Sequence, residues 1–414
     1  MEIKIHRGTQ EIGGTVVELS SANNTILLDM GLPLSPKSQS IDVSLLEPDA
    51  VFISHPHQDH FGLITALSDD VPVYIGKLGR NLIEATTMFL GHEFHSNTFS
   101  FISDQQQIKV GDFTITPYLT DHSAVDAYSF LIEADGKRIF YSGDFRAHGR
   151  KSVLFERMIN NPPDDIDVLL MEGTMLKRSN SDFPTETAVE QKIASTIRQQ
   201  ANISFLICSS QNIDRIVSAY RACLKTGKKM VVDFYTAWIL EQVKAVSQSV
   251  PNIDWNHVCL YADYHPDQIV RNNTKYFGDF RKRAYASRVT KEELQSDPSG
   301  YLVISKMSKY KVMSLYKKYD SPVNVIYSQW LGYLNCSDDE YFGAEAISDY
   351  RNDPEVNFLY AHTSGHAVLD DLKRFASAVA PKYLIPIHTE CGDQFPDNFS
   401  NVKILQNSEV FGQI

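Results

Sequence analysis

Three histidines and an aspartate lie within the six residues His55-Pro56-His57-Gln58-Asp59-His60. The segment directly follows the apolar run AVFIS, which predicts a loop at the carboxyl end of a buried strand. In a near-extended loop, side chains two residues apart project to the same side, so His55 and His57 could converge on one ion while Asp59 and His60 turn toward a second. Imidazole and carboxylate groups at this density suit zinc, whereas a polar loop that merely contains them is the weaker alternative.

One loop cannot complete a two-metal site, so further ligands must come from other parts of the chain. His122 follows the expected strand Phe113–Leu119, and Asp144 follows the expected strand Arg138–Ser142. Both side chains therefore stand at strand ends, and the two oxygens of Asp144 could bridge two ions. For His122 taken alone, a capping or hydrogen-bonded histidine is the open alternative.

The elements that must hold these residues are short strands in the first part of the chain. Several segments (TILLDM, AVFIS, VLLM) are apolar without interruption, as strands buried on both faces are. Lys77–Leu90 is the clearest helix in this part. The expected strands, besides the two already named, are Glu2–His6, Thr15–Leu19, Thr25–Asp29, Ala50–Ser54, Gln107–Val110, Tyr128–Glu133 and Asp167–Met171.

From about Phe183 the pattern changes to helix, strand, helix, which is typical of a parallel α/β layer. Pro184 and Glu186 both suit the first turn of a helix. The expected elements are the helices Pro184–Gln200, Ile213–Lys225 and Ala237–Ser247 and the strands Ile203–Cys208, Lys229–Phe234, Tyr301–Ser305 and Val323–Tyr327.

The segment HTSGHA stands between an expected strand, Val356–Ala361, and an expected helix, Ala367–Ala380. Ser364, Gly365 and His366 would then lie at a helix N-terminus, where free N–H groups and the helix dipole attract an anion. A glycine lets the backbone approach a ligand closely, and a histidine could bind a phosphate oxygen or donate a proton. An ordinary helix cap is the open alternative.

In this arrangement the chain resembles the metallo-β-lactamase superfamily. The pattern of that superfamily is an early aspartate, HxHxDH, a lone histidine, an aspartate and a final histidine, and Asp29 in LLDMG matches the first position. The resemblance implies that Asp29 orients a ligand histidine rather than binding metal. It implies one zinc ion held by His55, His57, His122 and Asp144, and a second held by Asp59, His60, Asp144 and the final histidine.

Three histidines, His362, His366 and His388, are candidates for that last ligand. His388 follows the expected strand Lys382–Ile387 and lies 244 residues after Asp144 (388 − 144), far too many for a loop, so a domain must be inserted. Such an insertion resembles the β-CASP group of nucleases. It implies an α/β fold, a metallo-β-lactamase αββα sandwich with an inserted β-CASP-type parallel α/β domain. We expect the sandwich at residues 1–182 and 351–414 and the inserted domain at 183–350.

Three landmarks of the β-CASP group are present. They match Glu172 in LLMEGT, with Thr174 after it, His366 in HTSGHA and His388 in PIHTE. The resemblance makes His388 the final metal ligand, and a histidine at this position is typical of RNA-acting rather than DNA-acting members. It therefore implies a zinc-dependent ribonuclease that acts on single-stranded RNA, which the inserted domain would help to enclose.

The implied reaction is hydrolysis of a phosphodiester by a hydroxide that bridges two Zn²⁺ ions, with Mn²⁺ as the alternative metal; a metal-bound water has a pKa of about 7. Asp59 would orient or deprotonate the nucleophile, and His366 would stabilise the phosphorane or protonate the leaving 3′ oxygen. Glu172 belongs to the same catalytic set. Ser364, Gly365 and His366 would bind the phosphate. Endonuclease and 5′-exonuclease action both stay open.

Three rival functions stay open. The superfamily motif alone would allow a small-molecule hydrolase of esters, thioesters or lactones. A di-iron oxidoreductase of the same fold typically has glutamate in place of the second histidine of HxHxDH, which is His57 here. A non-catalytic RNA-processing relative would usually have lost ligands, and this chain keeps the full set.

Length and charge set broader limits. The chain is 43% hydrophobic and 22% charged, as an ordinary globular protein is. Its 414 residues are more than a domain with a single hydrophobic core usually contains, so we expect two domains. The net charge of -12 counts mildly against an RNA partner, although a metal centre supplies positive charge where a phosphate must bind. The five scattered cysteines argue against a disulfide framework and against a thiolate metal site.

Location and assembly are predicted less directly. We see neither a membrane-spanning run nor a signal peptide, so we expect a cytoplasmic protein with no membrane partner. Ribonuclease J members carry a further C-terminal domain that aids dimer formation. This chain extends only 26 residues past His388 (414 − 388), so we expect that domain to be absent, and a homodimer stays open.

Basic and aromatic residues interleave in one stretch, as in proteins that bind single-stranded nucleic acid, although a solvated face is the open alternative. This predicted RNA track consists of Arg271, Lys275, Arg281, Lys282, Arg283 and Arg288 with Tyr276, Phe277, Phe280 and Tyr285, followed by Lys306, Lys309, Lys311, Lys317 and Lys318. Among the remaining histidines, His92 and His95 have a helical spacing but lack a third ligand nearby, and His148 could line the cleft.

Overall fold

The computed structural model describes residues 1–412 apart from 36, 37, 39, 93, 95–97, 199 and 318–320. The chain divides into two compact units, each of which is built from segments distant in sequence. Unit 1 comprises Met1–Ile83, Phe94–Asn180 and Gly365–Ile414, and unit 2 comprises Glu84–Glu93 and Ser181–Ser364.

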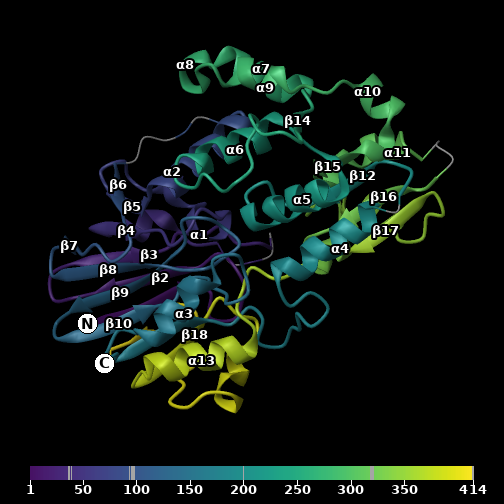
Figure 1. Ribbon diagram of the computed structural model, residues 1–414. Helices are drawn as coiled ribbons and strands as arrows, with labels where there is room; N and C mark the ends of the chain where they lie inside the picture. The colour runs from purple at the N-terminus through teal and green to yellow at the C-terminus, as the bar shows by residue number, and fades with distance from the viewer. Residues whose placement is uncertain are drawn as a thin grey trace. The chain divides into compact units, whose positions relative to one another are not determined.

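Unit 1 contains two mixed sheets (Figure 1). The strands of the first are β1 (Glu2–Arg7), β2 (Val16–Ser20), β3 (Thr25–Leu28), β4 (Ala50–Phe52), β5 (Val73–Gly76), β6 (Phe99–Ile102) and β19 (Val410–Phe411), in the order β19-β1-β2-β3-β4-β5-β6. Those of the second are β7 (Ile108–Val110), β8 (Phe113–Leu119), β9 (Tyr128–Ala134), β10 (Lys137–Tyr141), β11 (Val168–Glu172) and β18 (Tyr383–Ile387), in the order β18-β11-β10-β9-β8-β7.

The two sheets face each other across one hydrophobic core. Alternate residues of β1 to β4 meet alternate residues of β8 to β11, as in the cluster that joins Ile3, Phe52, Phe130 and Ile139. Burying a large apolar side chain of this kind contributes roughly 1.5–3 kcal/mol to folding. The paired strands β1 and β19 also bring the two ends of the chain together (Figure 1).

Helices cover the outer face of each sheet of unit 1. The short α1 (Gln58–Phe61) and α2 (Lys77–Phe89) supply Phe61 and Ile83 to a cluster against the first sheet. The helices α3 (Ser152–Asn160) and α13 (Leu369–Val379) supply Phe155 and Phe375 to a cluster against the second. The expected αββα sandwich is therefore confirmed.

Unit 2 is a wholly parallel sheet flanked by helices. Its strands are β12 (Ser204–Ile207), β13 (Lys229–Val232), β14 (Val258–Leu260), β15 (Tyr301–Ser305), β16 (Val323–Tyr327) and β17 (Val356–Tyr360), in the order β14-β13-β15-β12-β16-β17. Its helices are α4 (Glu186–Arg198), α5 (Ile213–Thr226), α6 (Phe234–Lys244), α7 (Tyr264–Asn272), α8 (Thr274–Phe277), α9 (Phe280–Ala286), α10 (Lys291–Ser296), α11 (Tyr310–Ser314) and α12 (Ala344–Asp349). The expected parallel α/β insertion is confirmed.

Much of the predicted RNA track proves to be structural. Phe277 and Phe280 are 3% and 1% exposed and pack against Trp238, so these two members of the predicted track belong to the core of unit 2. The guanidinium of Arg281 pairs with Asp267, and that of Arg283 with Glu241 and Asp254. The ammonium groups of Lys309 and Lys317 pair with Asp263 and Asp353. Lys318 lies outside the described residues.

No helix in the described ranges is long and apolar enough to cross a membrane.

Candidate metal centre

The histidine-rich loop follows β4 and ends in α1, whose first residue is Gln58. His57 occupies the N-cap position in an extended conformation, so the chain turns into the helix directly after it. His122 follows β8, Asp144 follows β10, Glu172 ends β11 and His388 follows β18. All of these positions belong to unit 1, and the strand-end placement expected from the sequence is what gathers them.

The gathered side chains form overlapping groups in which one ligand atom of each residue lies within 4.8 Å of the others. The groups are His55, His57 and His122; His55, His60 and Asp144; Asp59, His60 and His388; and Asp144, Glu172, His366 and His388. We call these residues together the cage. This cluster of imidazoles and carboxylates fits a metal-binding site.

Asp144 lies between the groups. Its Oδ2 is 3.1 Å from Nε2 of His60 and 3.7 Å from Nε2 of His55, whereas its Oδ1 is 3.7 Å from Nδ1 of His388. The two oxygens of one carboxylate thus face different histidines, as a ligand shared by two cations requires.

His60 provides the clearest test of whether a cation suits this cage. Its Nδ1 is 2.7 Å from Oδ2 of Asp29, and its Nε2 is 3.1 Å from Oδ2 of Asp144. Burial would lower the pKa of His60, but Asp144, Asp29 and Asp59 outweigh it and raise this pKa well above the ordinary value. Nε2 is fully buried and makes no hydrogen bond within the described part of the chain. The carboxylates around His60 thus favour a positive charge at Nε2, which a bound cation would supply in place of the proton.

Three histidines of the cage, unlike His60, are held neutral, the form that binds metal. Burial lowers the pKa of His57 to about 4, although Asp59 opposes the shift. Burial also lowers the pKa of His55 and His122 well below the ordinary value, and the neighbouring imidazoles add to the effect.

The carboxylates of the cage are held anionic. Burial alone would raise the pKa of Asp144, but His388, His60 and His366 outweigh it and lower that pKa well below its usual range. The pKa of Asp59 is lowered in the same way, since His60 and His388 outweigh its burial. Neutral imidazoles beside ionised carboxylates are the protonation states that a divalent metal needs.

Two residues of the site have backbone conformations that are unusual outside glycine. Asp29 has φ of 59° and His388 has φ of 50°, and each directly follows a strand. Such conformations persist only where the surroundings enforce them. At His388 they do so through the backbone N–H, which donates to the carbonyl of Gly8 over 2.6 Å, and through the hydroxyl of Thr174, which is 2.9 Å from Nδ1.

The buried Glu172 and the partly exposed His366 form an acid–imidazole pair beside Asp144. Nδ1 of His366 is 3.1 Å from Oε2 of Glu172, which also accepts from the backbone N–H of Thr174. Burial would lower the pKa of His366, but Glu172 and then Asp144 outweigh it and raise this pKa to about 9. His366 is therefore a charged donor at neutral pH.

The loop around His366 differs from the expectation in one respect. The helix begins at Leu369, not Ala367, because Val368 is extended and forms a parallel bridge with Met175. Gly365 and His366 are thus not in the first helical turn. The helix N-terminus therefore attracts an anion at these residues less strongly than the sequence analysis predicts.

Gly365 instead allows a close approach of backbone to side chain. A Cβ at Gly365 would lie 2.6 Å from Oγ of Ser123 and 3.2 Å from Cε1 of His122. The carbonyl of Gly365 is 2.6 Å from Nδ1 of His122 and accepts its proton, which directs the other ring nitrogen, Nε2, toward His57. Ser364 is 8% exposed and belongs to unit 2.

Several supporting residues were not foreseen from the sequence. The hydroxyl of Tyr141 donates to Oδ2 of Asp29 over 2.5 Å, and the backbone N–H of Ser54 donates to Oδ1 over 2.7 Å. Next to His122, Asp121 accepts from the guanidinium of the fully buried Arg146. These contacts join residues far apart in the chain, so no local sequence pattern predicts them.

The other described histidines that the sequence analysis considered are not in the cage. His148 is 3.3 Å from the amide nitrogen of Asn180, and His92 is exposed. His362 lies in unit 2, where its Nδ1 is 3.1 Å from the carbonyl of Ser328. His95 is outside the described residues.

Two family models match parts of the chain. Residues 24–204 match the family described as "Beta-lactamase superfamily domain", and residues 355–394 match "Zn-dependent metallo-hydrolase RNA specificity domain". The chain is 23% identical to Ribonuclease J of Helicobacter pylori over 415 aligned positions, which cover 92% of this chain and 55% of that protein. It therefore spans about half the length of the Helicobacter relatives it matches.

Two further similarities extend the comparison. An RNase J-like protein of Methanocaldococcus jannaschii is 26% identical over 303 positions, covering 68% of this chain and 66% of that protein. The crystal structure of a protein of unknown function from Enterococcus faecalis has the same fold, with a TM-score of 0.76 at 20% identity and coverage of 99% of both chains. Residues 24–204 of the chain thus resemble the β-lactamase superfamily domain, and over most of its length the chain is similar to ribonuclease J proteins.

Proposed function

We propose that the protein is a metal-dependent ribonuclease that hydrolyses phosphodiester bonds of single-stranded RNA. The observation that carries this proposal is the cage itself, in which residues between His55 and His388 meet around the carboxylate of Asp144. The match to an RNA specificity domain over residues 355–394, which includes His366 and His388, favours RNA over a small-molecule ester.

We further propose that the cage holds two Zn²⁺ ions, with Mn²⁺ as the alternative. One would be held by His55, His57, His122 and Asp144, and the other by Asp59, His60, Asp144 and His388. Zinc suits this set because it prefers imidazole and carboxylate ligands in closely packed sites. When bound, such a metal pair supplies Lewis-acid polarisation of the phosphate and lowers the pKa of water close to neutrality.

The chain's own residues would then handle the protons. Asp59 is anionic and can orient the attacking water or accept its proton. His366 is protonated at neutral pH, and Glu172 accepts from its Nδ1, which leaves the Nε2 proton for the leaving 3′ oxygen. Ser364, Gly365 and His366 are the proposed phosphate-binding loop.

The decisive experiment uses RNA labelled at each end and carrying a 5′-phosphate or a 5′-triphosphate. Cleavage should need added zinc or manganese, and His57→Ala or Asp144→Ala should abolish it, while the exposed His92→Ala should not. The product ladder separates endonuclease from 5′-exonuclease action. Cleavage by the His57→Ala protein, or hydrolysis of thioesters and lactones but not of RNA, would overturn the proposal.

We also propose the domain boundaries given above, a homodimer and a cytoplasmic location. The domain boundaries at 182/183 and 350/351 can be checked by limited proteolysis. A homodimer can be checked by light scattering, and a cytoplasmic location by fractionation of cells.

A further inference from the structure

Arg7, the last residue of β1, buries a positive charge inside unit 1. Its side chain is 1% exposed, its Nε donates to the carbonyl of Gly14 over 2.7 Å, and its Nη2 donates to the carbonyl of Gly31. Burial lowers the pKa of this guanidinium, and the carboxylate of Glu11 opposes the shift. Because burying a charge costs free energy even when its donors are satisfied, stability alone is a weak reason for an arginine here.

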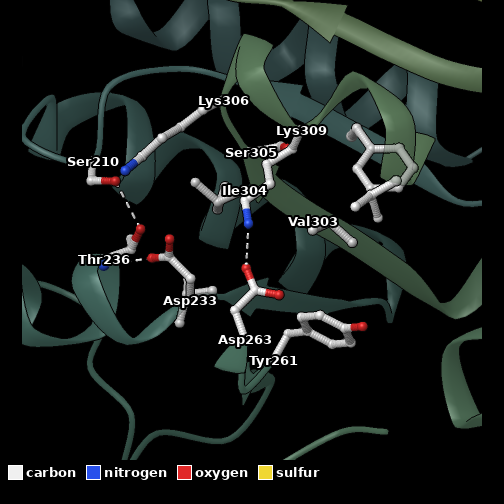
Figure 2. A pocket seen from close by; sticks show the side chains of 13 residues that line it. Ser210, Asp233, Thr236, Tyr261, Asp263, Val303, Ile304, Ser305, Lys306 and Lys309 are labelled. Atoms are coloured by element: carbon white, nitrogen blue, oxygen red, sulfur yellow. Dashed lines mark hydrogen bonds and ion pairs between the residues drawn. The ribbon is translucent and has the colours of Figure 1, made fainter. Parts of the chain in front are cut away.

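An ordinary ion pair in unit 2 shows the difference. In a small pocket of that unit, Nζ of Lys309 is 2.7 Å from Oδ2 of Asp263, so the two charges offset each other (Figure 2, dashed line). The side chain of Lys309 is also 43% exposed, so water solvates its ammonium. The guanidinium of Arg7 is closed off from water and joins parts of the main chain that lie seven and 24 residues away.

These two hydrogen bonds fix the β1–β2 loop, residues 8–15, to the segment that follows β3. Gly13 and Gly14 near the end of the loop have φ of 80° and 67°, in the left-handed region. A Cβ at Gly14 would lie 2.5 Å from Nε of Arg7, so no side chain fits between the loop and the guanidinium. Arg7 thus connects the start of the loop to its end.

The end of the β1–β2 loop packs on Asp59. A Cβ at Gly13 would lie 3.0 Å from Oδ2 of Asp59, and a Cβ at Gly31 would lie 1.7 Å from its carbonyl oxygen. The backbone N–H of Thr15 donates to that carbonyl over 3.2 Å, and the N–H of Gly31 donates to the carbonyl of Thr15 over 3.0 Å. The two segments that Arg7 joins therefore confine both the backbone and the carboxylate of Asp59.

The start of the same loop binds His388. The carbonyl of Gly8 accepts from the backbone N–H of His388 over 2.6 Å, and the hydroxyl of Thr9 donates to Oδ1 of Asn407 over 2.7 Å. Asp59 belongs to the loop after β4 of the first sheet, whereas His388 follows β18 of the second. The β1–β2 loop therefore contacts one cage residue from each sheet, and Nε2 of His388 lies 3.4 Å from Oδ2 of Asp59.

We propose that Arg7 is a positioning residue for one of the two metal positions, the one formed by Asp59, His60 and His388. The inference rests on the proposed function, which places an ion there. By holding both ends of the β1–β2 loop, the guanidinium keeps Asp59 and His388 at the spacing that one ion needs. His122, of the other position, is oriented by a different group, the carbonyl of Gly365. Loss of Arg7 should therefore weaken one ion and not the other.

The test is titration of the metal-free protein with Zn²⁺ against a competing chelator, which resolves two affinities. Arg7→Met should weaken the binding of one ion about 10- to 100-fold and leave the other unchanged, and Arg7→Lys should be intermediate. The ring signals of His388 and His122 in NMR identify the ion, since only those of His388 should need more zinc to shift. Ile3→Ala is the matched control, because it removes a buried side chain from the same strand and should change neither affinity.

Equal weakening of both ions by Arg7→Met, or of neither, would overturn the proposal, as would a shift that changes for His122 alone. If Arg7→Met does not fold, a pair of glycine variants tests the loop. Gly13→Ala presses a methyl group on Asp59 and should weaken the same ion. Gly136→Ala is its control, because Gly136 also has a positive φ, 68°, but has nothing within 4 Å of a Cβ. Equal affinities in the two glycine variants would refute the role of the loop.

Hydrogen exchange of the metal-free protein separates this proposal from that of the metal pair. In Arg7→Met and Arg7→Lys, the amides of Thr15 and His388 should exchange at least about tenfold faster relative to those of β11 and β18, because the loop that holds them opens more often. Uptake of a single ion by the unaltered chain would refute the metal pair, and the exchange of these two amides would still decide the role of Arg7. Unchanged exchange at both amides would reject it.

Discussion

At the scale of single residues, the balance between burial and neighbouring carboxylates sets the protonation state of each histidine in the cage. For His57 burial outweighs the carboxylate of Asp59 and lowers the pKa to about 4. His366 meets Glu172 and Asp144, and its pKa is raised to about 9. At neutral pH one histidine of the site is thus neutral and the other is positively charged, which suits the first to bind metal and the second to donate a proton.

The raised pKa of His366 can be tested in the metal-free protein. Because the carboxylate of Glu172 stabilises the imidazolium, Glu172→Gln should move the pKa of His366 from about 9 down toward about 6.5, the ordinary value for histidine. The measurement is a pH titration of the histidine ring signals by NMR. Glu190→Gln, which alters a buried carboxylate of unit 2, is the control and should leave the titration unchanged.

The same shift has a consequence for stability with a definite sign. A histidine whose pKa is higher in the folded than in the unfolded protein stabilises the fold fully below about pH 6.5, and this contribution is lost as the pH rises through about 9. Glu172→Gln should flatten that part of the stability profile. An unchanged profile would show that the pair is not coupled in solution.

Tyr141 is a residue whose importance is visible only in the structure. Its hydroxyl holds Asp29, which in turn orients His60, so Tyr141→Phe should weaken metal binding about tenfold without changing any proposed ligand. Competition with a chromophoric chelator measures this affinity. Tyr128→Phe is the matched control, because Tyr128 lies on the neighbouring strand and donates instead to Asp126. Equal affinities in the two variants would refute the role assigned to Tyr141.

At the scale of elements, unit 2 anchors the start of the HTSGHA loop through a buried guanidinium. Arg215 of α5 pairs with Glu186 of α4, and both side chains are almost fully buried. The same guanidinium donates to the carbonyl of Ser328 after β16 over 2.9 Å and to that of Thr363 over 3.2 Å. One side chain thus fixes the ends of two strands and two helices.

Arg215→Met should therefore lower the free energy of unfolding by about 3–5 kcal/mol, because it leaves the carboxylate of Glu186 buried without its partner. The double variant Arg215→Met/Glu186→Met should recover a large part of this loss. Chemical denaturation followed by circular dichroism measures both. Lys225→Met, which removes the half-exposed partner of Glu190, should cost no more than about 1 kcal/mol. Equal losses from the two single variants would contradict this account.

The elements also show how far the sequence could be interpreted. The strands β8, β15 and β16 match their predicted bounds, since each is a short apolar run between clear turn signals. The helices α7 to α10 were not predicted, because they are four to nine residues long and too short for a helical periodicity to emerge. The cage residues were predicted because they follow such strands, whereas Tyr141 and Arg146 were missed because their partners are distant in sequence.

At the scale of the whole molecule, the net charge of -12 does not describe the local fields. Basic side chains of the stretch from Arg271 to Lys317 are in part neutralised by carboxylates such as Asp254, Asp263 and Asp353. Composition therefore did not predict that part of the track is neutralised. For the same reason, changing the paired Arg283 tests the stability of unit 2 rather than nucleic-acid binding.

The division into two units makes metal binding a probe of how the whole chain unfolds. All proposed ligands lie in unit 1, so a metal at about 1,000 times its Kd should stabilise that unit by about 4 kcal/mol. If the units open separately, hydrogen exchange should slow in β4, β8, β10 and β11 on adding zinc and stay unchanged in β12 to β16. Asp144→Ala should remove the effect while leaving the exchange of unit 2 as it was. Equal protection of both sheets would instead mean that unit 2, although it has its own core, unfolds only together with the sandwich into which it is inserted.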